Sequence, residues 1–164
     1  MIRIRPYQEA DAKTVGQLIA NTYSDFNLSY LPIEERGPYL GPFRHSGSED
    51  AGHREEIAQT IQADIVLVAE EDGKIAGALR GKKGRLQSLF VLGECHGQGI
   101  GRQLVRRFED ICLKLGSKQV TLASSLFAVP FYQRMGYKKS TGVREGKSFH
   151  GAGLRFQPMK KILD

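Results

Sequence analysis

The sequence predicts an α/β fold in which a mixed central sheet of about six to seven strands is flanked by about four helices. One observation is a run of short β-rich segments, residues 64–70, 75–80 and 85–92, with turn signals between them. Another is an amphipathic helical pattern over residues 100–115, followed by a strand pattern at residues 119–123. An antiparallel meander that leads into a strand-helix-strand unit gives a mixed sheet.

The first elements are a strand, a helix and a segment rich in turn residues. Residues 2–5 alternate apolar and charged side chains, as a strand does, and Asp11 is a candidate N-cap for the helix that follows. Residues 27–52 are punctuated by Pro and Gly, so they predict a long loop. Helical spacing returns at residues 53–62. A long ordered loop in a compact domain is more often functional than idle, so we expect this loop to serve a site.

Beyond the meander, the chain predicts one long helix, one short helix and further strands. Gly116 is a candidate C-terminal cap for the long helix. Pro130 suits the first turn of a short helix within residues 123–137, because its missing N–H costs little there. Strand patterns at residues 137–141 and 154–162 close the chain.

Length and composition bound the class of protein. The 164 residues suffice for one buried core and are few for two, so we expect a single domain over residues 1–164. No apolar run approaches the roughly 20 residues of a membrane span, so we expect no membrane partner. The first residues lack the apolar core of a secretion signal, which predicts a cytoplasmic protein. Cys95 and Cys112 have no metal-ligand spacing, so we expect free thiols and no metal site.

The net charge of +6 favours an anionic partner. Basic residues gather at residues 80–85 and 138–161, but Gly81 and Gly84 make the first group look like a hairpin turn. No helix-turn-helix spacing, zinc finger or aromatic RNA-binding signature accompanies these residues. We therefore expect no nucleic-acid partner.

A glycine-dense turn joins the strand at residues 85–92 to the long helix. Gly97, Gly99 and Gly101 let the backbone approach a ligand with no Cβ in the way. The first N–H groups of the helix lack intrahelical partners, and such groups bind phosphate oxygens well. Turns also use glycine for purely conformational reasons, so this turn indicates a ligand site only together with a second motif.

The second motif is Phe-Tyr-Gln-Arg-Met-Gly-Tyr at residues 131–137. Together the two segments resemble the GNAT acetyltransferases, whose acetyl-CoA loop reads Arg/Gln-x-x-Gly-x-Gly/Ala and whose later helix often carries Phe-Tyr-x-x-x-Gly-Tyr/Phe. The loop pattern matches residues 96–101, with His96 where the family usually has Arg or Gln. The resemblance covers residues 64–137 strongly and is weak before them. It implies a GNAT fold and transfer of an acetyl group from acetyl-CoA, the co-substrate, to a primary amine by direct attack in a ternary complex.

The resemblance also implies a cofactor site. In this family the strand before the glycine loop pairs with the pantetheine arm like an added strand, and the helix N-terminus holds the pyrophosphate. Carried onto this sequence, the expected acetyl-CoA site consists of Phe90, Val91, His96, Gly97, Gln98, Gly99, Ile100, Gly101, Arg102 and Ser124. His96 binds a phosphate oxygen in one reading and is an ordinary loop histidine in the other. Ser124 or Ser125 either caps the short helix, which we favour, or bonds the pantetheine.

Amide formation requires that the acceptor ammonium lose a proton and that the departing CoA thiolate gain one. The resemblance places Tyr132 on the helix that faces the cofactor sulfur, so we expect Tyr132 to be the general acid. In the structural reading, Phe131 and Tyr132 are core aromatics instead. Because adjacent helical residues point in different directions, only one of them need be core.

We assign no general base. Many enzymes of this family use a glutamate on the strand before the glycine loop, whereas here that strand offers Arg85, Gln87 and Ser88. An amine that is already neutral in the pocket is one route, and a base acting through water is another. The candidates for such a base are Glu34, Glu35, His45 and His53. Cys95 lacks a convincing partner motif for an acyl-cysteine, so we do not expect covalent catalysis.

The acceptor is less well defined. Aromatic residues among the N-terminal prolines and glycines favour a small amine or amino-acid-like acceptor with an apolar or aromatic portion. These residues are Tyr23, Phe26, Tyr30, Tyr39 and Phe43. The same aromatics also suit a core or a contact between two copies of the chain, so a homodimer stays open. The alternative function is a CoA-binding or acetyl-CoA-binding regulatory module without transferase activity, because the strand glutamate is missing and His96 departs from the family pattern.

Overall fold

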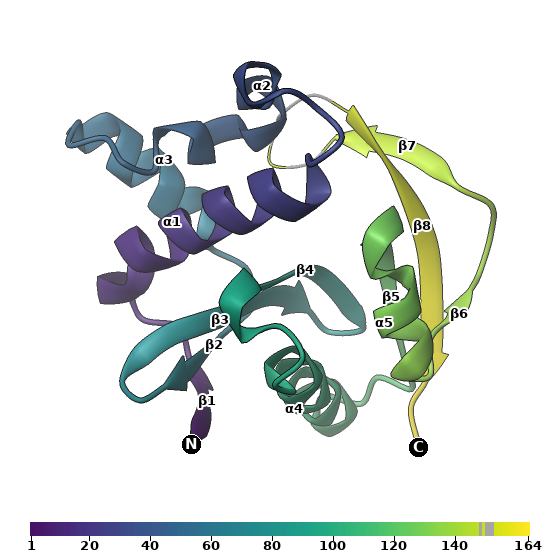
Figure 1. Ribbon diagram of the computed structural model, residues 1–164. Coiled ribbons are helices and arrows are strands. Elements are labelled where there is room, and N and C mark those ends of the chain that lie inside the picture. Colours follow the sequence, from purple (N-terminus) through teal and green to yellow (C-terminus); the bar gives the residue numbers. More distant parts are fainter. Residues whose placement is uncertain (148, 150–152) are drawn as a thin grey trace.

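The computed structural model describes residues 1–147, 149 and 153–164 (Figure 1). The described strands form one sheet of order β1-β2-β3-β4-β5-β8-β6, and β7 pairs with β8. The strands are β1 (Ile2–Pro6), β2 (Ile65–Glu71), β3 (Lys74–Lys82), β4 (Arg85–Val91), β5 (Gln119–Ser125), β6 (Lys138–Lys139), β7 (Arg144–Lys147) and β8 (Gly153–Ile162). The helices are α1 (Ala12–Thr22), α2 (Gly37–Leu40), α3 (Ala51–Ile61), α4 (Ile100–Lys114) and α5 (Val129–Arg134).

The predicted α/β class with a mixed sheet is confirmed. β4 and β5 run parallel, and the other pairs of described strands are antiparallel. The sequence analysis missed β7, because residues 144–147 carry no apolar alternation and are held by backbone pairing to β8. It also missed the short helix α2, which lies within the expected loop.

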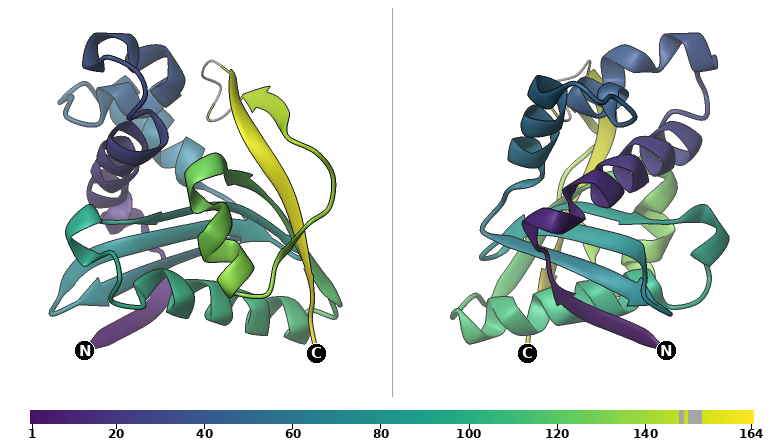
Figure 2. Two further views of the ribbon diagram at one scale, coloured as in Figure 1. Left: turned by 45° about the vertical axis from the view of Figure 1, so that its right-hand side comes forward. Right: turned by 90° about the vertical axis from the view of Figure 1, so that its left-hand side faces the viewer.

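Helices cover both faces of the sheet, with α1 and α3 on one face and α4 on the other (Figure 2). Strand alternation sends neighbouring side chains to opposite faces. Leu67 of β2 therefore packs in the cluster with Leu104 and Phe108 of α4, whereas Val68 packs in the cluster with Val15 of α1. Each large apolar side chain buried in this way contributes roughly 1.5–3 kcal/mol. Within the described part of the chain, no helix is long and apolar enough to span a bilayer.

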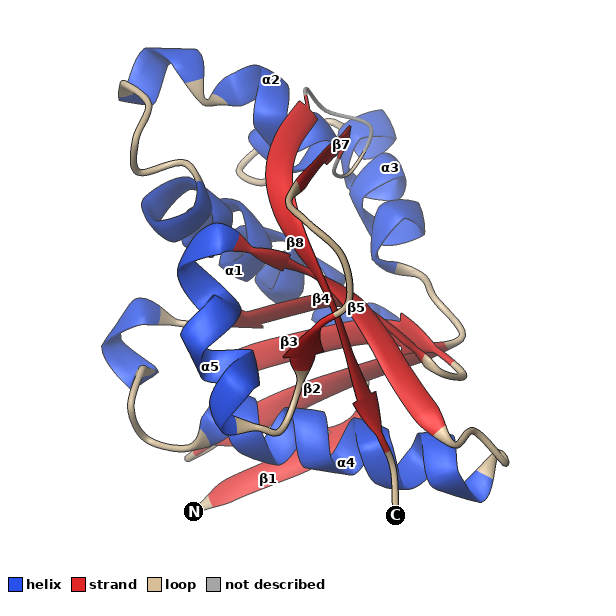
Figure 3. Cartoon of the chain, turned by 90° about the vertical axis from the view of Figure 1, so that its right-hand side faces the viewer, coloured by secondary structure: helices blue, strands red, loops and turns tan. Residues whose placement is uncertain are grey.

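The sheet splits between its two central strands. β4 and β5 pair only where they begin, at Arg85 with Thr121 and at Leu86 with Leu122. β5 then follows β8 over its whole length, from Gln119 to Ser125. The ends of β4 and β5 diverge as a result, and Figure 3 shows β8 running past β5 toward β7 and the N-terminal helices. The opening between the two strands is where a ligand can enter the sheet.

A bulge in β4 decides which groups face that opening. Arg80 of β3 pairs with Ser88, while the next residue, Gly81, pairs with Leu86, so Gln87 is left without a partner in β3. An extra residue of this kind bends the strand and re-aims the residues after it. Residues 88–91 of β4 border the opening, and residues 85–86 pair with β5. The pairing of these two parts with β3 is therefore offset by one residue.

The prediction of a long loop over residues 27–52 is wrong for much of its length. The chain forms a π-helical turn at Tyr23–Asn27, 3-10 turns at Ile33–Glu35 and Gly41–His45, and α2 between them. The prolines do not break these turns, because they occupy first-turn positions, where proline is tolerated. Tertiary burial of Leu28 and Phe43, both fully buried, holds the turns on the domain.

Asp11 lies at the start of α1 as predicted, but its carboxylate does not cap that helix. It accepts hydrogen bonds from the guanidinium of Arg5, at 2.8 and 2.9 Å, and from the backbone N–H of Gln8 at 2.8 Å. Arg5 also bonds Glu70 of β2. The Arg5 hydrogen bonds lower the pKa of Asp11. Charge pairing therefore ties the start of α1 to β1 and β2.

Candidate functional site

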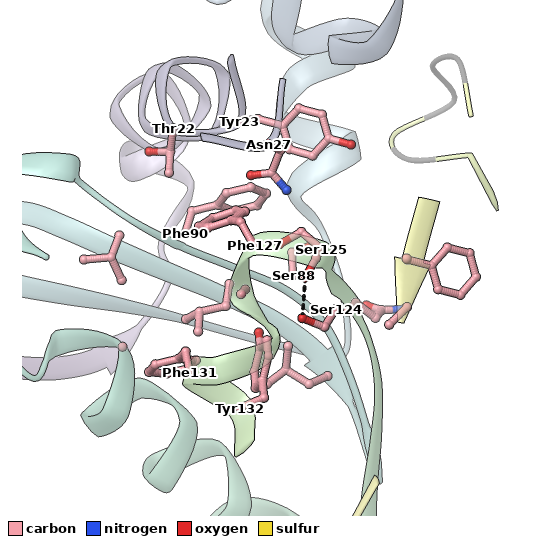
Figure 4. A pocket seen from close by; sticks show the side chains of 18 of the residues that line it. Thr22, Tyr23, Asn27, Ser88, Phe90, Ser124, Ser125, Phe127, Phe131 and Tyr132 are labelled. Carbon is pink, nitrogen blue, oxygen red and sulfur yellow. Dashed lines mark hydrogen bonds between the residues drawn. The ribbon is translucent and has the colours of Figure 1, made fainter. Parts of the chain in front are cut away.

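A cavity of about 1240 Å³ occupies the opening between β4 and β5. Its walls come from β4, the loop before α4, β5, α5, the end of α1 and the β7–β8 hairpin. Figure 4 shows Tyr23 and Asn27 at its upper end and Tyr132 at its lower end, with Phe90, Ser88 and Ser124 between them. A cavity of this size can hold a cofactor-sized ligand with a second, smaller molecule.

The glycine loop lines one end of this cavity, as the sequence predicts. Gly97 and Gly99 have φ of +80° and +83°, and no atom lies within 4 Å of where a Cβ would stand. Gly99 is the N-cap of α4, and its carbonyl accepts the N–H of Gln103 at 3.0 Å. The preceding N–H groups of the first turn are therefore free of helical partners and available to an anion.

Gly101 has a different role from its two neighbours. A Cβ there would lie 3.3 Å from the Phe131 ring, so the missing side chain lets α4 pack closely against α5. Gly101 still borders the cavity, as do Gln98, Ile100 and Arg102. The loop thus combines two uses of glycine, one for backbone conformation and one for helix packing.

His96 forms defined contacts within the protein. Its Nε2 lies 2.8 Å from the carbonyl oxygen of Val91, and its ring centroid lies 4.6 Å from that of Phe26. With the proton on Nε2, the imidazole donates to Val91. This contact links the glycine loop to the end of β4.

The backbone of β4 presents alternate residues to the cavity. The N–H of Leu92 donates to Ala76 of β3, and hydrogen-bonded pairs alternate along an antiparallel ladder. The backbone groups of Phe90 therefore point to β3, and those of Leu89 and Val91 point to the opening. The sequence analysis expected the backbone groups of Phe90 and Val91 at a ligand and did not name Leu89, because the bulge at Gln87 that sets this alternation carries no sequence signal.

Tyr132 lies at the inner end of the cavity. Its side chain is 6% exposed, and its ring packs against Phe131 and Tyr137 at centroid distances of 5.0 and 5.7 Å. Figure 4 shows the ring directed from α5 into the cavity. Burial raises the pKa of the Tyr132 phenol. The phenol therefore keeps its proton at neutral pH and can donate it.

The predicted helix cap by Ser124 or Ser125 is wrong. The residue before α5 is Ala128, without a side-chain cap, and Ser125 instead precedes the 3-10 turn Leu126–Ala128. Ser124 is buried, and its Oγ donates to the Ser125 carbonyl at 2.7 Å. Both serines line the cavity.

None of the predicted water-mediated bases borders the cavity. Glu34 and Glu35 are exposed in a 3-10 turn. His45 and His53 stack on each other at 3.9 Å, and Nδ1 of His53 lies 2.8 Å from Ser48 Oγ, all away from the cavity lining. Among the described residues that line the cavity, there is no Asp or Glu.

The predicted aromatic residues are divided by the fold. Tyr23 lines the cavity, and Phe26 stacks near Phe127, 6.1 Å away. Phe43 lies in the core, and Tyr30 is 66% exposed. The N-terminal aromatics therefore do not form one wall.

The two cysteines are free thiols, as predicted. Cys95 borders the cavity, and its pKa is raised, first by burial and then by the nearby Glu71 and Glu94 carboxylates. A raised pKa reduces the thiolate fraction, which is the nucleophilic form. Cys112 is buried under the sheet and lies outside the cavity lining.

Comparisons with known proteins agree with this geometry. The family model described as the acetyltransferase (GNAT) domain matches residues 41–163. An uncharacterized N-acetyltransferase of Methanocaldococcus jannaschii is 34% identical over 87 residues. That match covers 48% of this chain and 56% of the relative, so the chain spans little more than half the length of the relative.

Solved structures share the fold. A GCN5-related N-acetyltransferase from Rhodopseudomonas palustris superposes with a TM-score of 0.78 at 19% identity, over 98% of this chain and 95% of that one. The PaiA N-acetyltransferase from Thermoplasma acidophilum, in complex with coenzyme A, gives 0.70 at 19% identity, over 99% of each chain. A putative acetyltransferase from Salmonella typhimurium, with acetyl-CoA, gives 0.62 at 19% identity, over 100% of this chain and 95% of that one.

Proposed function

The chain belongs to the GNAT acetyltransferase family, and from that premise we propose that it transfers the acetyl group of acetyl-CoA to a primary amine on a small acceptor. The resemblance drawn from the two sequence motifs is thereby confirmed. One observation carries the proposal: a single cavity joins the free N-terminus of α4 to the buried phenol of Tyr132. An acyl donor held at the first end can place its thioester near the second.

Acetyl-CoA fits the groups that line this cavity. The pyrophosphate lies on the N–H groups from Gly97 to Arg102, where the helix dipole adds on the order of 0.3–1 kcal/mol. The pantetheine arm pairs with the backbone groups of Leu89 and the N–H of Val91 as an added strand, and Ser124 borders the same part of the cavity. His96 fixes the loop through Val91, and its Nδ1 can donate to a phosphate oxygen only when both ring nitrogens are protonated.

In the proposed reaction, the neutral amine nitrogen attacks the thioester carbonyl carbon in a ternary complex. The new C–N bond forms, the C–S bond breaks, and the departing thiolate takes the proton of the Tyr132 hydroxyl. The attacking nitrogen loses one of its two protons as the amide forms, and a proton passes through water to the Tyr132 oxygen, which restores the phenol. The ammonium proton of the acceptor passes to water before the attack, since the described lining holds no carboxylate to take it. Positioning and proton donation are the contributions of this chain.

Replacement of Tyr132 by Phe tests the proposal. We expect Tyr132→Phe to lower kcat roughly 100-fold or more, the usual contribution of a general acid, with unchanged acetyl-CoA affinity. Release of CoA thiol measures turnover, and isothermal titration measures binding. Tyr30→Phe, at an exposed tyrosine outside the cavity lining, is the control and should keep full activity. Full turnover in Tyr132→Phe would exclude the general-acid role.

The absence of a carboxylate from the described lining favours a second candidate, an acetyl-CoA-binding regulatory module. This module would bind acetyl-CoA and release no thiol with any amine in a broad panel. Turnover that is lost in Tyr132→Phe while binding persists would exclude it.

The proposal takes residues 1–164 as one acetyltransferase domain that works in the cytoplasm without nucleic acid, and it leaves a homodimer open. The acceptor is expected to have an apolar or aromatic portion, because Tyr23 and Phe90 line the cavity. Gel filtration and a screen of amines, with thiol release as the readout, test these points.

A further inference from the structure

The charged side chains among the described residues that line the cavity are all basic. Its described lining contains cationic side chains and no carboxylate. The cationic residues are Arg85, Arg102, Arg134, Lys147 and Arg155. A cleft lined by one sign of charge attracts ligands of the opposite sign and repels polycations.

These cations lie at different parts of the cavity, with Lys147 in β7 and Arg155 in β8. Arg102 lies in the first turn of α4 and Arg134 at the end of α5, where they suit the phosphates of the acyl donor. Arg85 is the first residue of β4, and Val91, the last, leads toward the glycine loop. At 3.3 Å per residue, the strand separates these two residues by about 20 Å. Arg85 is therefore too far from the loop to share its pyrophosphate.

Arg85 is a half-buried cation without an anionic partner among the described residues. Its Nη1 lies 3.3 Å from the hydroxyl of Thr121, a long hydrogen bond. Other half-buried basic residues have more partners: Arg5 bonds Asp11, Lys161 bonds Glu109 at 2.9 Å, and Arg80 donates to the carbonyl of Ile61 at 2.8 Å and to Ser88 Oγ at 3.0 Å. Withdrawing a charge from water without a partner is costly, so Arg85 favours an anion that arrives with a ligand.

The register of the sheet surrounds Arg85 with further positive charge. Cross-strand pairing aligns Lys82, Arg85, Thr121, Lys160 and Lys138 in one row across β3, β4, β5, β8 and β6. Paired residues point to the same face, and neighbouring residues such as Leu86 and Leu122 point to the opposite face, toward α4. The row therefore lies on the face away from α4.

We propose that the acceptor carries an anionic group, a carboxylate or a phosphate, at the end opposite its amine, and that Arg85 binds this group. The inference rests on the proposed transferase function. Ser88 and Leu89, beside the expected thioester position, follow Arg85 by three and four strand residues, so amine and anion are separated by roughly 10 Å. The planar guanidinium suits bidentate binding of either anion.

The same charges help the amine to react. Cations near an ammonium favour its neutral form, and the neutral amine is the nucleophile. In such an acceptor, the anion neutralises Arg85, and the amine lies near the other cationic side chains, which favour its neutral form. The site can therefore acetylate this acceptor without a carboxylate base. Spermidine-like acceptors, which carry only positive charge, are disfavoured by the same field.

A length series of acceptors tests the proposal on the whole protein. The series contains glycine, 4-aminobutanoate, 6-aminohexanoate and 8-aminooctanoate, with 6-aminohexyl phosphate, hexylamine, octylamine and 1,6-diaminohexane for comparison. We expect kcat/KM to rise with length and to exceed that of the matched alkylamine roughly tenfold or more for the long amino acids. The phosphate compound shows which anion is preferred. Equal values for amino acids and alkylamines, or a preference for the diamine, would overturn the proposal.

Variants assign the effect to the residue. Arg85→Gln should lower kcat/KM for 8-aminooctanoate roughly 10- to 100-fold through KM, with unchanged acetyl-CoA affinity, and Arg85→Lys should restore part of the loss. Lys74→Gln, at the exposed β2–β3 turn, removes an equal charge from outside the cavity lining and should have no effect. A loss of equal size in Lys74→Gln, or none in Arg85→Gln, would contradict the role of Arg85.

Binding measurements distinguish a failure of the anionic-acceptor proposal from a failure of the proposed transferase function. If no amine in the series is acetylated, the anion site can still be tested by binding. The affinities of N-acetyl-6-aminohexanoate, which is anionic, and N-hexylacetamide, which is uncharged, are then compared for the CoA-saturated protein. Tighter binding of the anionic compound supports the inference, and equal affinity overturns it. Absence of any acetyl-CoA binding would instead contradict the proposed function.

Discussion

The two ends of the cavity are built in different ways. The proposed cofactor end consists of consecutive backbone groups, the glycine turn and the first turn of α4, and its geometry follows from φ angles and helix termini. The acceptor end is assembled from β4, the end of α1 and the β7–β8 hairpin, which are far apart in the chain. The first end depends on local conformation and the second on tertiary packing, so mutations should affect the two ends separately.

The largest effect is expected at the acceptor end, in the core beneath it. Phe43 is fully buried, and its ring packs edge-on against Phe149 at 4.8 Å. Phe43→Ala should lower the free energy of unfolding by about 3–5 kcal/mol, because it removes a large buried side chain. Denaturant unfolding measures the loss, and titration on the protein that remains folded should give an unchanged acetyl-CoA affinity. A large loss of that affinity would show that the two ends are coupled.

The next effect tests the cofactor end alone. Gly99→Glu adds a carboxylate and a side chain where a phosphate is expected, at φ +83°, and should weaken acetyl-CoA binding about 100-fold or more. Gly73→Glu is the matched control, since Gly73 has φ +78° in the β2–β3 turn and open space around it. Both variants should lose about 1–2 kcal/mol of stability from the left-handed backbone, but the control should bind acetyl-CoA normally. Normal binding by Gly99→Glu would place the pyrophosphate elsewhere.

The smallest effect concerns the charge pairing that holds α1 over the acceptor end. Hydrogen bonds from Arg5 keep the pKa of Asp11 below its usual value in the folded state. This contribution is therefore present above the unfolded pKa, about 3.9, and is lost as pH falls through the folded pKa. Asp11→Asn should lower the free energy of unfolding by about 1–3 kcal/mol at pH 7. Wild type and variant should converge in denaturant unfolding as the pH falls below the folded pKa of Asp11, and an unchanged gap in acid would contradict the pairing.

Short-range sequence patterns made the conformation of the glycine turn and the start of α4 predictable. Gly97 and Gly99 adopt the positive φ that their type allows, and α4 begins at Ile100 as its apolar spacing indicates. The meander of β2, β3 and β4 also lies close to its predicted bounds, because hairpin turns and alternation are short-range patterns.

The acceptor end gave weaker signals. The helical turns from Tyr23 to His45 were hidden by their prolines and glycines, which indicate a loop when packing is unknown. β7 has no apolar pattern and exists through its pairing with β8. From the sequence, Arg85 was assigned only to a basic hairpin turn and to a strand that offers no general base, because its place in a row of cations depends on the pairing of five strands.

The sequence by itself determined the α/β class, the glycine turn with its helix N-terminus, and the motif that carries Tyr132, since each follows from residues close together in the chain. Tertiary structure alone decided that β5 follows β8 and leaves β4, that the bulge at Gln87 turns Leu89 and Val91 toward the opening, and that Arg85 lies there without an anion. The physical reason is that strand register and cavity charge arise from contacts between distant segments, whose free energies no local pattern records.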